Sequence, residues 1–110
     1  MKFYYQGKLV RTSKTHNYKY GVFTKENDCL ACASSFELAQ NSIASATMFK
    51  RSSLKSYNKI LKAIKQGKEK IILGRNIFKI TETAEQCEEQ IKKIEEYLKG
   101  IHIEELTQGE

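Results

Sequence analysis

The sequence has 110 residues, 40% of them hydrophobic and 29% charged, with a formal net charge of +6 at pH 7. This length suits one compact core, and the hydrophobic content argues against wholesale disorder. No run approaches the length of a membrane span and no signal-peptide pattern follows Met1, so a membrane or secreted chain is not predicted. We expect one domain over residues 1–106, a frayed end at 107–110 and a cytoplasmic location.

The first predicted elements are two short strands, residues 2–5 and 8–12, on either side of Gln6-Gly7. Two residues that include a glycine are typical of a tight hairpin, because glycine readily adopts a positive φ. The expected register pairs aromatic with aliphatic side chains: Phe3 with Val10 and Tyr4 with Leu9.

Two more strand-like segments follow, at residues 18–24 and 29–33, separated by the polar turn 25–28. The first of them places Tyr18, Tyr20 and Val22 on one face by strict alternation. The first third of the chain is therefore predicted to be an antiparallel meander of four strands.

A helical pattern begins where Ser34 precedes Glu37, the spacing of a capping box. Apolar residues then recur at helical spacing in two runs: Phe36, Ala39, Ile43, Ala46 and Phe49, followed by Leu54, Tyr57, Leu61 and Ile64. The pattern allows one long helix or two helices joined near residues 51–53, and we favour two helices or one kinked helix because Ser53 could cap anew. Gly67 is the expected stop.

The last third begins with a second hairpin pattern, in which strands 70–73 and 77–80 bracket residues 74–76. Thr83 with Gln86 then repeats the capping box. An apolar stripe follows and ends before Gly100: Ala84, Cys87, Ile91, Ile94 and Leu98. The sequence thus predicts an α+β fold with an N-terminal antiparallel sheet, a basic helical middle, a second β-hairpin and a C-terminal acidic amphipathic helix.

Charge is distributed unevenly along the chain. Residues 1–80 hold sixteen of the nineteen cations against four acids, and 16 minus 4 is +12; residues 81–110 hold three cations against nine acids, which is −6. A basic body of this kind is attracted to phosphate or to acidic protein surfaces.

The strongest candidate binding surface is a basic face on the helical middle. Its cations are Lys50, Arg51, Lys55, Lys59, Lys62 and Lys65. No acid occurs between Glu37 and Glu69 to pair with them, whereas a purely solvated face usually mixes both signs. The alternative is that these lysines only keep the protein soluble.

A second candidate surface lies on the predicted sheet, where cations alternate with aromatic rings as in sheets that bind nucleic acid. Its residues are Lys2, Lys8, Arg11, Lys14, Lys19, Tyr18 and Tyr20. The competing interpretation is that the tyrosines fill a thin core.

The three cysteines do not predict a metal centre. Cys29 and Cys32 have the C-x2-C spacing, and Cys87 with His16 or His102 could add ligands. In an extended strand, however, an odd separation points two thiols to opposite faces, so we interpret Cys32 and Cys87 as core residues. Neither histidine has a local partner that defines a nucleophile or base. We therefore expect no metal, no cofactor and no catalytic residue.

The runs KFYYQGKLVRTSK at 2–14, YKYGV at 18–22 and FELA at 36–39 resemble small proteins of bacterial phages and mobile elements, some of which inhibit CRISPR effector nucleases. The resemblance implies a non-enzymatic binder of a nucleic acid or nucleoprotein complex in a bacterial host cell, with CRISPR inhibition as its most specific form.

A second likeness is to the arm-binding domain of phage integrases, a three-stranded sheet followed by one helix. It implies a DNA-binding accessory module in recombination or transcription, but the fourth predicted strand, the long basic middle and the second hairpin depart from that pattern. A structural or interaction protein without nucleic-acid contact is the third alternative.

Overall fold

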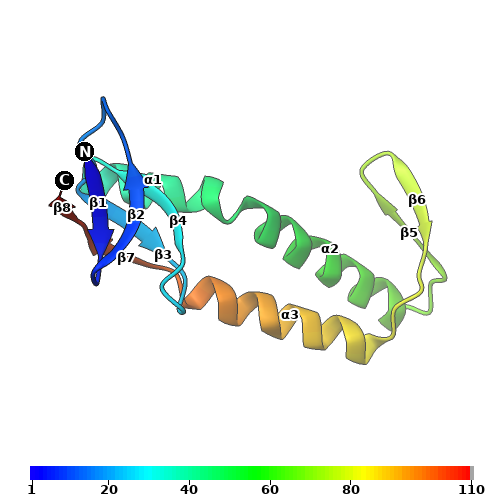
Figure 1. Cartoon of the computed structure of the whole chain (residues 1–110). Coiled ribbons are helices and arrows are strands. Elements are labelled where there is room, and N and C mark those ends of the chain that lie inside the picture. Colours follow the sequence, from blue (N-terminus) through cyan, green and yellow to red (C-terminus); the bar gives the residue numbers. More distant parts are fainter. Residues whose placement is uncertain (110) are drawn as a thin grey trace. The chain divides into compact units, whose positions relative to one another are not determined.

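The computed structural model describes residues 1–109 and confirms the α+β class (Figure 1). Over these residues the chain forms three helices: α1 (Phe36–Ala46), α2 (Met48–Lys65) and α3 (Ala84–Lys99). It also forms eight strands: β1 (Lys2–Tyr5), β2 (Lys8–Thr12), β3 (Tyr20–Phe23), β4 (Cys29–Ala33), β5 (Lys70–Leu73), β6 (Asn76–Lys79), β7 (His102–Glu105) and β8 (Thr107–Gly109). No helix in this described part is long and apolar enough to cross a lipid bilayer.

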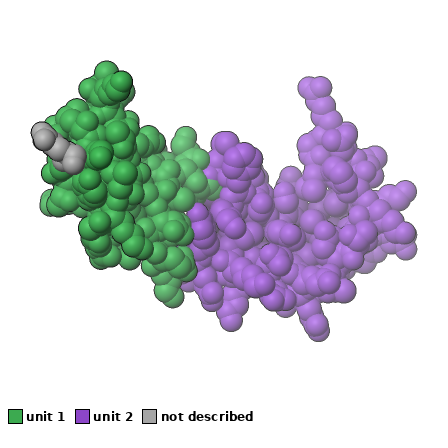
Figure 2. Space-filling model, viewed as in Figure 1, with its two compact units in different colours: residues 1–47, 100–110 green, residues 48–99 purple. Residues whose placement is uncertain are grey.

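The chain divides into two compact units (Figure 2). We call residues 1–47 with 100–110 the sheet unit and residues 48–99 the helical unit. Both ends of the chain therefore belong to the same unit, and the helical unit is inserted between them. The single domain expected over residues 1–106 stays a prediction.

The sheet unit contains two three-stranded antiparallel sheets, with strand orders β2-β1-β8 and β4-β3-β7. The predicted meander is therefore wrong, because β3 takes β7 rather than β2 as its second neighbour. The segment between β2 and β3 is seven residues long, too long to impose pairing as a tight turn does. The C-terminal strand also brings Ile103 opposite Val22, which adds apolar surface to the core.

The core of the sheet unit lies where α1 packs against β3 and β4. Val22, Ala33 and Ala39 are buried at its centre. Partly buried side chains surround them: Tyr20, Ala31, Ile43, Ile101 and Ile103. Phe3 and Phe23 are also fully buried. This core explains the glycine at position 21, where a Cβ would lie only 2.6 Å from the Phe23 ring.

The β1–β2 hairpin has the predicted turn and part of the predicted register. Gln6 and Gly7 have φ angles of 49° and 77°, and positive values at both central residues are what a type I′ turn requires. Tyr4 lies opposite Leu9 as expected, but Phe3 lies opposite Arg11 rather than Val10. A bulge between these two pairs shifts the register by one residue.

A second bulge reverses an expectation about the cysteines. In the β3–β4 pairing Val22 lies opposite Ala31 and Phe23 opposite Cys29, so Leu30 is the additional residue. Cys29 and Cys32 consequently lie on one side of β4 with their Sγ atoms 3.7 Å apart. The prediction that these thiols point to opposite faces is wrong, because it assumed a regular strand.

The C-terminal segment is ordered by the sheets it completes. Thr107–Gly109 form β8 along the open edge of β1, so the expected fraying at 107–110 is wrong for residues 107–109, whose backbone finds strand partners. Glu110 lies outside the described residues.

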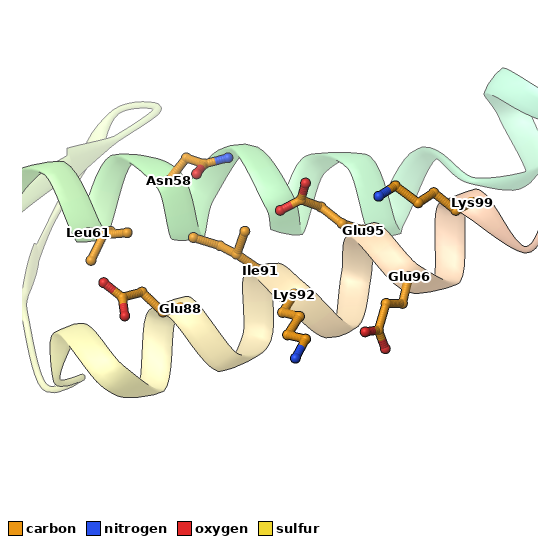
Figure 3. A pocket seen from close by; sticks show the side chains of 8 residues that line it. All are labelled: Asn58, Leu61, Glu88, Ile91, Lys92, Glu95, Glu96 and Lys99. Atoms are coloured by element: carbon orange, nitrogen blue, oxygen red, sulfur yellow. The ribbon is translucent and has the colours of Figure 1, made fainter.

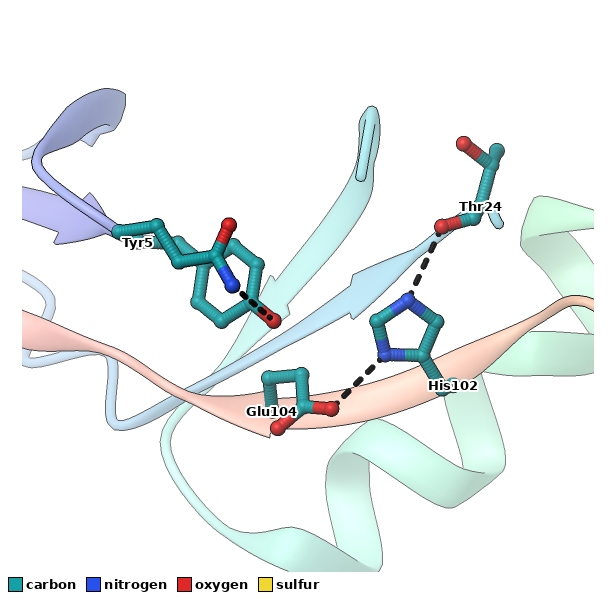
Figure 4. A network of polar contacts seen from close by, with 5 residues as sticks. Tyr5, Thr24, His102 and Glu104 are labelled. Carbon is teal, nitrogen blue, oxygen red and sulfur yellow. Dashed lines mark hydrogen bonds and ion pairs between the residues drawn. The ribbon is translucent and has the colours of Figure 1, made fainter. Parts of the chain in front are cut away.

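In β7, His102 Nε2 lies 3.0 Å from the Thr24 carbonyl and Nδ1 lies 2.9 Å from Glu104 Oε1 (Figure 4). The contact with Thr24 ties β7 to the end of β3.

Helix α1 begins at a serine cap, one residue later than predicted. The Leu38 N–H donates to Ser35 Oγ at 3.1 Å, so Ser35 rather than Ser34 is the N-cap. The helix ends at Thr47, whose N–H and hydroxyl both donate to the Ile43 carbonyl, at 3.0 and 2.7 Å.

The favoured arrangement of two helices over residues 36–66 is thus found, but the break lies at Thr47 rather than at 51–53. Thr47 is only 1% exposed, so its hydroxyl must find a partner, and the helix's own carbonyl supplies one. Ser52 and Ser53 are exposed to solvent and continue α2.

In the helical unit, α2 and α3 run antiparallel and pack along their length (Figure 1). The buried side chains between them are Ile60, Ala63, Cys87 and Ile94. The predicted capping box of α3 is confirmed: the Thr83 N–H donates to Gln86 Oε1 at 2.9 Å, and the Gln86 N–H donates to Thr83 Oγ1 at 3.2 Å. The predicted stop of α2 is confirmed as well, since Gly67 has a φ of 74°.

The turn at Gly67 leads directly into the second hairpin. Gly67 and Lys68 donate backbone hydrogen bonds to the carbonyls of Ile64 and Ala63, the pattern of a Schellman cap. Strands β5 and β6 then pair with Leu73 opposite Asn76, so the connecting turn has two residues rather than the three expected. The hairpin leaves apolar side chains exposed: Ile72, Ile77 and Phe78.

Candidate nucleic-acid interface

The division of charge between the two units differs from its division along the sequence. The sheet unit has six cations and six acids and is formally neutral. The helical unit has thirteen cations and seven acids, and 13 minus 7 is +6, the whole net charge of the protein. A polyanion is therefore attracted to residues 48–99.

Within the helical unit the positive charge lies mainly on α2, which has six cations and no acid. We call five of them the basic face: Arg51, Lys55, Lys59, Lys62 and Lys65. At about 100° per residue they lie within roughly 120° of the helix circumference. All five are exposed, on the side of α2 opposite the buried Ile60.

Lys50 was predicted to belong to this surface, but the structure places it elsewhere. Its Nζ lies 4.9 Å from the centre of the Tyr97 ring on α3. This cation–π contact engages Lys50 in packing between the helices.

The cations of the basic face have no acidic partner within their own unit. Between residues 48 and 99, all of which the structure describes, the one ion pair within 4.0 Å is Glu89–Lys93 on α3, at 3.2 Å. Lys62 and Lys65 lie in the last turn of α2, where positive charge interacts favourably with the helix dipole. That effect gives two of the lysines a structural role but leaves their ammonium groups available to a ligand.

A groove between the end of α2 and strand β5 extends the basic face. It encloses about 420 Å³ and contains no acidic side chain in its lining. We call it the lysine groove after four of its residues: Lys59, Lys62, Lys68 and Lys70. Ala63, Ile71 and Ile72 add apolar surface. The groove thus joins lysines from the basic face to lysines beyond the Gly67 turn.

Sequence reasoning missed Lys68 and Lys70 because helical periodicity ends at Gly67. The Schellman cap reverses the chain there and brings β5 back along α2. A cation on each side of Glu69, directly after a helix stop, is the signal that could have drawn attention to them.

The groove between α2 and α3 is different in character. It encloses about 340 Å³, and Figure 3 shows Leu61 and Ile91 among charged side chains of α3. Those side chains have both signs: Glu88, Glu95 and Glu96 with Lys92 and Lys99. Three carboxylates make this groove less favourable for phosphate than the basic face and the lysine groove, neither of which contains an acid.

The second predicted surface, on the sheet unit, has its aromatic rings engaged within the chain. Tyr18 meets the edge of Phe3 at 5.4 Å between ring centres, stacks with His16 at 5.5 Å and has Arg11 over its ring at 5.4 Å. Tyr20 belongs to the core and contacts Phe36. Rings already packed in this way are poor platforms for bases. Lys2, Lys8, Lys14 and Lys19 remain exposed.

Groups able to coordinate a metal or activate a nucleophile are sparse in the described part of the chain. Within residues 1–109 no three His, Cys, Asp or Glu side chains are grouped as metal ligands. Cys29 and Cys32 are free cysteines whose Sγ atoms contact each other at 3.7 Å. His102 is held by a carbonyl and a carboxylate, an arrangement that fixes the ring in the sheet unit.

Compared with protein-family models, curated proteins and solved structures, the chain matches none of them.

Proposed function

We propose that the protein is a non-enzymatic binder of nucleic acid and that the basic face with the lysine groove is its contact surface. The observation that carries the proposal is the concentration of the whole net charge on the helical unit, with no acid on α2 and none in the groove. Lysine ammonium groups are compact, mobile charges that suit phosphate oxygens.

The dimensions of the surface fit a nucleic-acid backbone. From Arg51 to Lys65 the basic face spans ~21 Å at a rise of 1.5 Å per residue. Successive phosphates of one DNA strand advance about 3.4 Å along the axis, so the face can follow roughly six of them. Its donors are lysines and one arginine, and contacts of this kind to phosphate carry no sequence information. We therefore expect binding that depends strongly on salt and weakly on base sequence.

The resemblance of residues 2–40 gives the proposal a narrower form. We propose that the target is a nucleic acid or nucleoprotein complex of a bacterial host, and that a CRISPR effector nuclease is inhibited by competition for its nucleic acid. A DNA-binding module in recombination or transcription uses the same surface, and preference for duplex DNA over RNA distinguishes it. An interaction protein without nucleic-acid contact binds neither duplex DNA nor RNA.

The test is binding of labelled duplex DNA and of single-stranded RNA across a salt series. Reversing Lys55, Lys59 and Lys62 to Glu is expected to weaken binding and to flatten the slope of log affinity against log salt by up to about 3 units. The matched control reverses Lys2, Lys14 and Lys19 on the sheet unit, which changes the net charge equally. Thermal melts confirm that both variants fold.

If both variants lose affinity equally, net charge rather than this surface drives binding and the assignment is wrong. A loss confined to the sheet variant moves the site to the sheet unit. Wild-type protein that binds neither nucleic acid at low salt overturns the proposed function.

A further inference from the structure

Cys29 and Cys32 form a thiol pair that the proposed function does not use. The β-bulge at Leu30 turns both side chains to one side of β4, and their Sγ atoms lie 3.7 Å apart. Both residues are half-buried, whereas Cys87 in the helical unit is fully buried. The pair is therefore close enough to interact and open enough to meet a small reagent.

Cys29 also borders a cavity. The cavity encloses about 320 Å³ and lies between the β1–β2 hairpin and the turn that precedes β4. Its charged side chains are Lys8, Glu26 and Asp28, and Tyr5 and Leu9 contribute to its wall. A molecule of a few heavy atoms has room to approach the Cys29 sulfur from this side.

The environments of the two thiols are unequal. The hydrogen bond with the Cys32 thiol, helped by the Ala31 backbone and the charge of Arg11 and opposed by partial burial, lowers the pKa of Cys29 to about 7. The same hydrogen bond, together with burial, raises the pKa of Cys32. Because Cys29 borders the cavity and has the lowered pKa, it is the better nucleophile of the two near neutral pH, while Cys32 keeps its proton.

We propose that Cys29 and Cys32 are a reversible dithiol–disulfide site that reacts with small disulfide molecules, Cys29 attacking and Cys32 resolving. The Cys29 thiolate attacks one sulfur of the small disulfide RSSR, which forms Cys29–S–S–R and expels RS⁻. This RS⁻ takes up from solvent the proton that Cys29 released on ionising. Cys32 then attacks the Cys29 sulfur, its proton passing to the second RS⁻ as that group leaves. The two cysteines are oxidised to one disulfide, and RSSR is reduced to two RSH.

The spacing of the pair supports the second step. The resolving sulfur is already in hydrogen-bond contact with the sulfur it must attack, so the mixed disulfide forms next to the thiol that resolves it. A regular strand would have placed Cys32 on the opposite face and left the mixed disulfide unresolved.

The experiment uses the reduced full chain with bis(2-hydroxyethyl) disulfide at pH 7 and follows products by mass spectrometry. Wild-type protein is expected to lose two hydrogens, and the peptide covering 26–50 carries the change because it contains both cysteines. Cys32→Ser is expected to stop at the mixed disulfide on Cys29. Cys87 serves as the internal control, since burial raises the pKa of its thiol and blocks access.

A second comparison separates this site from simple exposure. Cys32→Ser keeps a hydroxyl donor for the Cys29 thiolate, whereas Cys32→Ala removes it. At pH 7 we expect mixed-disulfide formation in the alanine variant to be roughly tenfold slower than in the serine variant. Equal rates for the two variants overturn the assigned role of Cys32. A wild-type chain that accumulates mixed disulfide without losing two hydrogens, or that reacts as fast at Cys87, overturns the site.

Discussion

The sheet unit and the helical unit are stabilised by different kinds of contact. The sheet unit is formally neutral, fully buries Phe3, Val22 and Phe23, and pairs strands from both ends of the chain. The helical unit is an antiparallel helix pair with a hairpin, carries the whole net charge and exposes Ile72 and Ile77. Its contacts are more local in sequence.

This difference suggests a division of labour. Burial and remote strand pairing stabilise the sheet unit, at the cost of closing a chain of more than a hundred residues when β8 meets β1. The helical unit keeps unpaired cations close together, and their mutual repulsion destabilises its fold. A bound anionic ligand would offset that repulsion. The comparison is testable, because each unit can be perturbed separately.

The largest effect is expected from Ile94→Asp in the helical unit. Ile94 is 6% exposed, so an aspartate there places an unpaired charge among apolar side chains and destabilises the α2–α3 packing by several kcal/mol. Amide exchange should show lost protection in α2 and α3. The control is Glu95→Asp at the exposed neighbouring position. Retained protection in α3 would contradict the assignment of Ile94 to the core.

The corresponding change in the sheet unit is Phe3→Ala. Phe3 is fully buried and contacts Tyr18, so removing its ring is expected to lower the free energy of unfolding by about 3 to 5 kcal/mol. The matched control is Phe49→Ala, because Phe49 is 83% exposed and its loss should change stability by less than about 0.5 kcal/mol. Denaturant unfolding measures both, and equal losses would mean that burial does not decide the effect.

A smaller effect is expected at the start of α3. Thr83→Ala removes the hydroxyl that accepts the Gln86 N–H and should cost about 1 kcal/mol. Thr83→Ser keeps the hydroxyl and should remain close to wild type. Thermal melting of the three proteins checks this, and an alanine variant as stable as the serine variant would show that the cap is not needed.

The smallest expected effect is a different response of the two units to salt. Screening reduces repulsion among the cations of α2, so raising sodium chloride from about 0.05 to 0.5 M should stabilise the helical unit by less than about 1 kcal/mol. The neutral sheet unit should change less. Exchange of the Ile60 and Val22 amides reports on each unit, and a larger gain at Val22 would contradict the charge partition.

Local patterns in the sequence determined much of this protein. Glycine at positions 7 and 67 placed a hairpin turn and a helix end, Thr83 with Gln86 placed the start of α3, and periodicity placed the cations of the basic face. These features depend on residues within a few positions of each other, which is why a single sequence suffices to predict them.

Tertiary structure alone decided the rest. Strand β7 forms because β3, about 80 positions away, offers an open edge, and β8 forms because β1, about 100 positions away, offers another. No local pattern in residues 102–109 predicts either strand. One bulge shifted the register of β1 and β2, and a second brought Cys29 beside Cys32. The return of β5 along α2 placed Lys68 and Lys70 in the lysine groove. Chain reversal and strand pairing determine which charges share a surface and which thiols lie close together. Both processes depend on contacts between distant residues, which the periodicity of the sequence does not encode.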